Sequence, residues 1–142
     1  MFSKTFGYAI RAVVFIGMHG QNGKRIGLQE LSNALEIPHH FLGKILQDLV
    51  RHGFIDSAKG PNGGFYINDR TFDTLATEVL QVTDGTLVLE QCALGIRRCN
   101  AAHPCLMHHD FAACKQGMVD ALSSKTIRHF IEELEQGQSF IV

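Results

Sequence analysis

The segment that decides the fold is residues 28–65, LQELSNALEIPHHFLGKILQDLVRHGFIDSAKGPNGGF. Leucines at helical spacing predict a short helix over 28–35, and a second apolar stripe predicts another helix between Pro38 and Gly53. Proline suits the first turn of a helix, and glycine enters the left-handed cap that ends one without steric cost. Two amphipathic helices joined this closely are typical of a helix-turn-helix.

The residues after Gly53 favour a β-hairpin. Short strands are predicted from Phe54 to Ala58 and from Phe65 to Asn68. They flank the turn-rich sequence KGPNGG at 59–64, which is longer than a tight two-residue hairpin loop. A hairpin directly after the helix pair indicates a winged helix-turn-helix.

Helical stripes also occur on both sides of this segment. We expect an N-terminal helix that ends near Gly20, and a fourth helix that Asp73 caps and Asp84 and Gly85 close. We also expect a helix after residue 107, interrupted by Ser123 and Ser124, and then a last short helix. The apolar positions of these four helices are Phe6, Ile10, Val13 and Gly17; Leu75, Val79 and Val82; Phe111, Cys114, Met118 and Leu122; and Ile127, Ile131 and Leu134. The predicted fold is therefore mainly α with a small β-hairpin wing, a winged helix-turn-helix domain plus a long dimerisation helix.

We divide the chain into a DNA-binding domain (1–83), a cysteine-rich loop (84–107) and a dimerisation helix with a C-terminal short helix (108–142). Phe111, Met118 and Leu122 are the candidate dimerisation residues, because a single apolar stripe on an otherwise polar helix is typical of pairing with another chain. Cys114 lies on that stripe, so we expect it to be a buried small hydrophobe.

Composition bounds the class of protein. The chain has 142 residues, 45% hydrophobic and 19% charged, which is the size and composition of one globular domain. No apolar run approaches the roughly 20 residues of a membrane span, so we predict a cytoplasmic protein with no membrane partner. Residues 1–70 carry eight Lys or Arg against five acids, and residues 71–142 carry five against nine, so the positive half is the one that contains the helix-turn-helix.

In a helix-turn-helix, the second helix of the pair enters the major groove of DNA with its N-terminal residues against base edges and phosphates. The candidate contacts on that helix are Pro38, His39, His40, Phe41, Gly43 and Lys44. Lys44 is the main charged candidate, whereas His39 and His40 are equally consistent with a solvated turn. At the hairpin tip, Lys59 and Asn62 are candidates for the minor groove or a phosphate, because neighbouring glycines allow close approach.

A second constellation is Cys92, Cys99, Cys105 and His108, with the spacing C-x6-C-x5-C-x2-H. Thiols gathered in a protein of the reducing cytoplasm indicate metal or redox chemistry. Structural zinc normally uses shorter intervals, so these longer ones favour an iron-sulfur cluster, with Arg97 and Arg98 offsetting its negative charge. Zinc, and a redox-active or inert thiol loop, are the alternatives, and His103 or His109 could replace His108.

Together the N-terminal helix, the helix pair, the sequence KGPNGGF at 59–65 and the three cysteines followed by Leu106-Met107-His108 make the chain resemble the Rrf2 family of bacterial winged-helix transcription regulators, which includes IscR-like and NsrR-like proteins. The resemblance implies a homodimer whose operator affinity depends on a cluster. The ending Cys-Leu-Met-His leans towards an IscR-like two-iron two-sulfur cluster, with four-iron four-sulfur as the other possibility.

This sequence departs from IscR-like members in two places. Six residues separate the first two cysteines where five are usual, and Gly43-Lys44 replaces a Glu-Gln pair, so the operator is not assumed to be shared. Tyr8 occupies the region where some NsrR-like members supply an acidic ligand, which weakens a nitric-oxide-sensing interpretation.

We therefore predict a homodimeric, sequence-specific regulator of double-stranded operator DNA, a repressor, controlled by an iron-sulfur cluster that senses cluster supply, redox state or nitric oxide. The alternative within the same fold is a cluster-free regulator, either constitutive or sensing through thiol oxidation. An enzyme is disfavoured because the chain has no phosphate loop, H-E-x-x-H, G-x-S-x-G or dinucleotide fingerprint.

Overall fold

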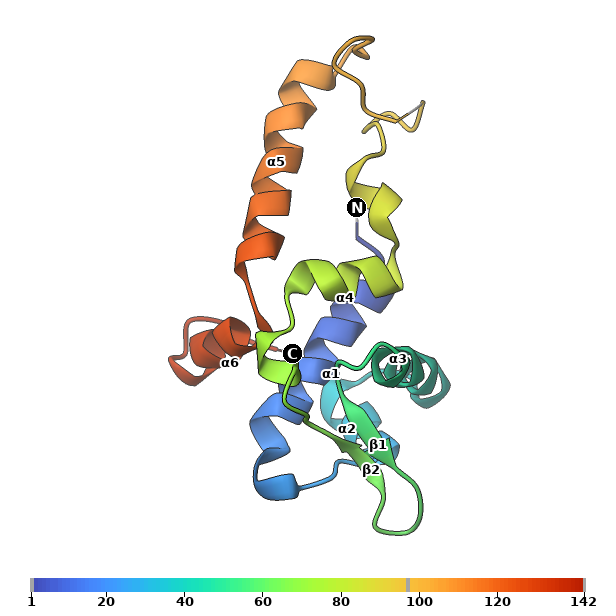
Figure 1. The fold of residues 1–142 in the computed structure, drawn as a ribbon, viewed down its shortest axis with the longest axis vertical. Helices are drawn as coiled ribbons and strands as arrows, with labels where there is room; N and C mark the ends of the chain where they lie inside the picture. Colours follow the sequence, from blue (N-terminus) through green and yellow to red (C-terminus); the bar gives the residue numbers. More distant parts are fainter. Residues whose placement is uncertain (1, 97, 142) are drawn as a thin grey trace.

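The computed structural model describes residues 2–96 and 98–141. Within these residues the elements are α1 (Lys4–His19), η1 (Gln21–Gly23), α2 (Leu28–Leu35), α3 (His39–Arg51), β1 (Asp56–Ala58), β2 (Gly64–Tyr66), η2 (Thr71–Asp73), α4 (Ala76–Thr83), η3 (Thr86–Leu89), α5 (His108–Ser124) and α6 (Ile127–Glu135) (Figure 1). Their order confirms the predicted winged helix-turn-helix with a long helix beyond it. No helix in this part of the chain is long and apolar enough to cross a membrane.

The core forms around α1, which contacts α2, α3, α4 and α6. This helix starts at Ser3, whose hydroxyl accepts a hydrogen bond from the Phe6 N–H at 3.1 Å and so satisfies one of the open donors of the first turn. Ala12, Val13 and Ile16 are completely buried on its inner face. Burying side chains such as Val and Ile stabilises the fold by about 1.5–3 kcal/mol each.

The turn between α2 and α3 is fixed by backbone geometry. Glu36 takes the left-handed conformation (φ 53°), and the Ser32 hydroxyl donates to the Ile37 carbonyl at 2.6 Å. Ile37 is buried and anchors the turn to the core. Gly53 (φ 77°) follows the end of α3, as predicted.

The wing is a hairpin in which Ser57 pairs with Phe65, flanked by Asp56 with Tyr66 and Ala58 with Gly64. Its strands are shorter than the sequence predicted, because Phe54 and Ile55 are buried in the core before pairing starts. Ile26 adds a further bridge, exchanging two 2.9 Å backbone hydrogen bonds with Phe65. The segment before α2 is thereby attached to the wing.

The predicted cap of the fourth helix is wrong. Asp73 lies in η2, and α4 begins after Leu75, whose N–H donates to the Glu78 carboxylate at 2.8 Å. That side chain closes the first turn from within the helix, so no side-chain oxygen is needed at the preceding position. Gly85 (φ 79°) follows α4, as predicted.

The last two helices behave differently. Ser124 ends α5 as predicted, and α6 returns to pack Ile127 and Ile131 against α1 and η2. In contrast, α5 has no fully buried residue among those described and forms an arm that projects from the core beside α4 (Figure 1). The cysteine loop lies at the far end of this arm.

Candidate functional site

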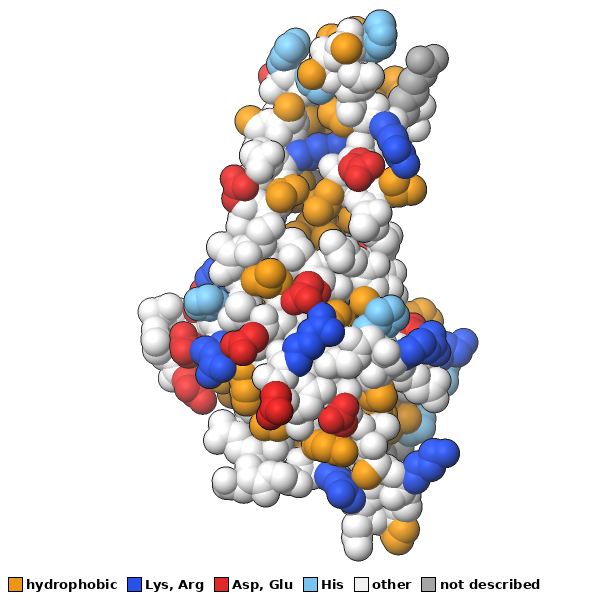
Figure 2. All heavy atoms as spheres, viewed as in Figure 1, with side chains coloured by type: hydrophobic (Ala, Val, Ile, Leu, Met, Phe, Trp, Pro, Cys, Tyr) orange, Lys and Arg blue, Asp and Glu red, His pale blue; other side chains and the backbone are white. Residues whose placement is uncertain are grey.

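The first candidate site is the outer face of α3 together with the wing. The apolar side of α3 is buried through Leu42, Leu46 and Leu49, so its polar side faces solvent. Pro38, His39, His40, Phe41 and Lys44 are all exposed, as are Lys59 and Asn62 in the wing. The face in Figure 2 carries several Lys and Arg side chains over α3 and the hairpin, whereas many Asp and Glu side chains lie over α6 and the middle of the molecule.

An open groove of about 340 Å³ joins these two elements, with Gln47 of α3 on one side and Ser57 and Lys59 of the wing on the other. Among the residues that the structure describes, no hydrogen bond or ion pair involves the side chain of Gln47 or of Lys59. Their polar groups are therefore available to a ligand that spans the helix and the wing.

Gly43, another candidate on α3, faces α2 on the side where a side chain would be. A Cβ built on this residue would lie 3.3 Å from Leu28 Cδ2, so the position allows α2 to pack closely on α3. Lys44, the next residue, points to solvent.

Several basic residues of the N-terminal half are used within the fold. Arg11 donates to the carbonyls of Ile141 (2.8 Å) and Leu35. Arg70 pairs with Glu78 at 2.6 Å. The basic residues that remain open to a ligand are thus fewer than the count in the sequence suggested.

Sequence reasoning missed two residues of this surface, Gln47 and Arg25. The Arg25 guanidinium lies 5.5 Å from the centre of the Tyr66 ring and 3.5 Å from the Asn62 carbonyl, which places a cation beside the wing tip. The sequence signal for Arg25 was the next residue, Ile26, which is apolar in a polar stretch. The bridge between Ile26 and Phe65 places Arg25 beside the wing. Gln47 could have been found from the α3 periodicity, since it lies one turn beyond Lys44.

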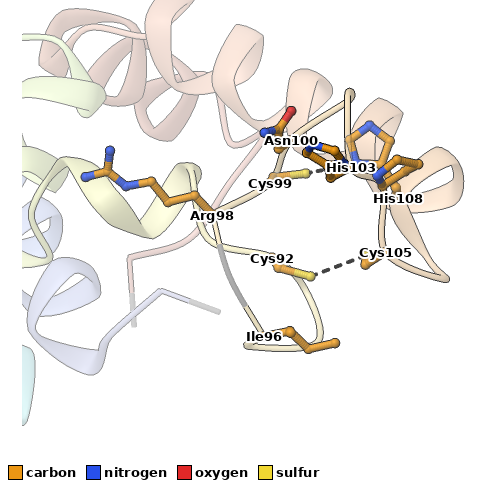
Figure 3. Close-up of a pocket in the computed structure, with 9 residues that line it drawn as sticks. Cys92, Ile96, Arg98, Cys99, Asn100, His103, Cys105 and His108 are labelled. Carbon is orange, nitrogen blue, oxygen red and sulfur yellow. Dashed lines mark hydrogen bonds between the residues drawn. The ribbon is translucent and has the colours of Figure 1, made fainter.

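The second candidate site is a pocket of about 610 Å³ at the end of the arm (Figure 3). It contains all four predicted ligands, with Cys92, Cys99 and Cys105 from the loop and His108 from the first turn of α5. His103, the alternative ligand, also lines it. Residues 13 positions apart in the chain are thus brought to one cavity.

The four side chains form two pairs. The Cys92 and Cys105 sulfurs are 3.3 Å apart, and the Cys99 sulfur lies 3.3 Å from His108 Nδ1 (Figure 3). The contact with Cys92 raises the pKa of the Cys105 thiol above its ordinary value. A metal bound there would have to displace that proton, because the thiolate is the ligand.

Local backbone bonds hold the cysteines in these places. Gln91 forms an isolated antiparallel β-bridge with Arg98, and the Cys99 N–H donates to the Glu90 carbonyl at 2.8 Å. The two ends of the segment between Cys92 and Cys99 therefore lie side by side. Gly95 (φ 68°) turns the chain between them. The Lys115 amine donates to the Gln91 carbonyl, which connects the loop to α5.

The donor set fits an iron-sulfur cluster better than a single ion. Thiolates with an imidazole are soft ligands of the kind that clusters use, and in a two-iron cluster each iron takes two of the four ligands. Among the described residues, no three His, Cys, Asp or Glu side chains are grouped closely enough to hold a metal ion.

Two expectations about neighbouring residues change. Arg98 lines the pocket, but its guanidinium extends away from the thiols and pairs with Glu90 at 3.8 Å (Figure 3). Arg97 lies outside the described residues. Cys114 is exposed on α5, so the prediction that it is buried is wrong for a single chain.

Comparison with known proteins identifies the family. Residues 2–133 match the Rrf2 family, described as an iron-dependent transcriptional regulator. The chain belongs to the Rrf2 family. It is therefore a winged-helix, DNA-binding transcription regulator.

Named Rrf2 relatives span most of the chain. It is 23% identical to the HTH-type transcriptional regulator IscR of Photorhabdus laumondii (90% of this chain, 77% of the relative). It is 24% identical to the HTH-type transcriptional regulator NsrR of Geobacillus kaustophilus (89% and 86%). Among solved structures, the fold is similar to CymR, the global cysteine regulator of B. subtilis (TM-score 0.76, 13% identity, 93% and 96% covered), and to T. potens IscR (TM-score 0.74, 15% identity, 99% and 92%).

Proposed function

We propose that this Rrf2 protein is a homodimeric, sequence-specific repressor whose operator binding is controlled by an iron-sulfur cluster on Cys92, Cys99, Cys105 and His108. The observation that carries the proposal is the pairing of three thiols and one imidazole in one pocket at the end of α5. The IscR and NsrR relatives support it at the level of the family. A two-iron two-sulfur cluster is favoured over a four-iron cluster because the ligands fall into two pairs.

The chain's own contacts provide a route from the pocket to the DNA-binding face. The loop is joined to α5 by the Lys115 bond, α5 packs on α4, and α4 packs on α1 and α3. Ser3 at the start of α1 donates its N–H to the Asp84 carboxylate at 2.7 Å, just after α4. When bound, a cluster supplies a removable, redox-active crosslink of the loop. A change in the loop is then transmitted to helices that orient α3.

Homodimerisation is proposed through α5. Phe111 is 37% exposed, and with Met118 it lines an open groove of about 310 Å³. Leu122 completes the stripe and packs in part on the core. A second copy of the arm would cover these side chains.

We retain 1–83, 84–107 and 108–142 as the proposed division of the chain. Within it, α6 of the last part packs on α1 of the first part.

The test is a metal count on protein purified without oxygen. We expect iron and acid-labile sulfide in near-equal amounts, about two of each per chain for a two-iron cluster, with visible absorption. Cys99→Ala should lose both, whereas the matched control Cys114→Ala should keep both because Cys114 lies outside the pocket. A colourless wild type, or a Cys99→Ala variant with undiminished iron, would overturn the cluster.

The second candidate is a cluster-free, thiol-sensing regulator. The 3.3 Å separation of the Cys92 and Cys105 sulfurs favours it, because a disulfide needs only a small further approach. In that reaction two thiols lose two protons and two electrons, and hydrogen peroxide accepts them to become two waters. A solved structure of S. aureus CymR in an oxidised form, similar in fold, makes this candidate specific enough to test. Mass spectrometry of peroxide-treated protein should then show a Cys92–Cys105 crosslink that Cys105→Ser lacks.

A further inference from the structure

One aromatic side chain on α3 lies where the fold gives it no role. Phe41 is 47% exposed, although Leu42, Ile45 and Leu46 of the same helix are at most 4% exposed. Its ring makes an edge contact with His40, 5.9 Å between centres, and that imidazole is itself exposed. An exposed phenyl ring gains free energy only when another molecule covers it.

The surroundings of Phe41 indicate what that molecule is. The ring lies in the first turn of α3, on the turn that also presents His40 and one turn before Lys44. Among the described residues, no hydrogen bond or ion pair involves the side chain of His40 or of Lys44. In the single chain, the α5 arm projects away from α3 (Figure 1). An apolar ring among open cationic and polar groups on this helix is suited to a DNA groove rather than to a protein surface.

We propose that Phe41 is a specificity-determining residue that reads a thymine in each operator half-site through its C5-methyl group. This inference rests on the proposed DNA-binding function and adds the chemistry of one base. In the major groove the standard bases present hydrogen-bonding groups and a single apolar one, the methyl of thymine. Phe41 has no polar atom beyond its backbone, so the methyl is the one base-edge group that its ring can prefer.

The experiment starts from an operator selected by the wild-type protein from a randomised DNA duplex library. Each thymidine of that duplex is then replaced in turn by deoxyuridine, which removes only the methyl group. For wild type we expect an affinity loss of about three- to fivefold at one position per half-site, the value of one buried methyl group. The Phe41→Ala variant should bind the thymidine and deoxyuridine duplexes equally at that position.

Two controls separate base reading from general damage. Phe41→Ala should unfold at the wild-type temperature because the ring is largely outside the core. Lys59→Ala should bind all duplexes more weakly and still lose affinity when the methyl is removed. Lys59 lies in the wing, and its proposed phosphate contact carries no sequence information. Failure of wild type to select any sequence would contradict the proposed function itself. A selected operator in which no thymine methyl matters, or in which the methyl matters equally to Phe41→Ala, would overturn only the role of Phe41.

Discussion

Single residues fix the junction between the wing and the segment before α2. Gly64 has φ 145°, and a Cβ there would lie 2.8 Å from the carbonyl carbon and oxygen of Ile26. Both the backbone conformation and the close approach therefore require glycine.

We expect Gly64→Ala to destabilise the protein by about 1–3 kcal/mol, because the strained conformation and the clash add together. The control is Gly7→Ala, since Gly7 is in α1 with open space around it and alanine favours helix by about 0.5–1 kcal/mol. Urea unfolding measures both. Equal stability of Gly64→Ala and wild type would show that the wing tolerates a side chain at this position.

Asp84 makes the stability of the protein depend on pH. Partial burial raises its pKa, but hydrogen bonds from the hydroxyl and N–H of Ser3 outweigh that effect, so the pKa is lowered from its ordinary value. A carboxyl group with a lowered pKa in the folded state contributes stability above its unfolded pKa, and this contribution is lost as the pH falls through the folded pKa.

Asp84→Asn should therefore lower the unfolding temperature at pH 7, and the difference from wild type should shrink as the pH falls below about 4. Thermal unfolding at a series of pH values measures this difference. A gap between the two proteins that is the same at pH 7 and pH 3 would mean that the carboxylate charge contributes nothing to the tie between α1 and the end of α4.

At the scale of an element, α5 is a helix whose apolar stripe the single chain does not bury. We expect Met118→Glu to shift the protein from dimer to monomer, because a carboxylate would be placed in the contact. Ala113→Glu is the control, since Ala113 lies on the opposite side of α5 by helical periodicity. Sedimentation equilibrium distinguishes the two. A Met118→Glu protein that stays dimeric would move the interface away from α5.

The wing is the second element with a measurable role. Lys59 has no ion-pair partner among the described residues, whereas Arg51 of α3 is paired with Asp48 at 3.0 Å. Lys59→Ala should weaken binding to all DNA sequences and reduce the slope of log K against log salt by about one. For Arg51→Ala we expect a smaller change. Unchanged salt dependence in Lys59→Ala would remove the wing tip from the phosphate contacts.

At the scale of the whole molecule, periodicity and turn chemistry predicted the order of the elements, because the apolar stripes of the helices other than α5 face one common core. The hairpin's short strands, the Ile26 bridge and the return of α6 could not be predicted, since they depend on contacts between residues distant in sequence. The same limit applies to charge. From the sequence, Arg11 and Arg98 count as cations available to a ligand. In the structure, Arg11 donates a hydrogen bond to the Ile141 carbonyl, and Arg98 forms an ion pair with Glu90.

The candidate cysteine site was predicted residue by residue from spacing, but its internal pairing was not. The C-x6-C-x5-C-x2-H pattern leaves open which side chains approach one another, whereas the folded loop brings Cys92 to Cys105 and Cys99 to His108. The second pair includes His108 of α5, and α5 packs on α4.

The most direct test of this account is the operator affinity of the same protein with and without its cluster. We would measure it by fluorescence anisotropy under anaerobic conditions for wild type, Cys99→Ala and Cys114→Ala. We expect wild type and Cys114→Ala with cluster to share one affinity, and cluster-free wild type and Cys99→Ala to share another that differs by about fivefold or more. Equal operator affinity for all four samples would contradict control by a cluster.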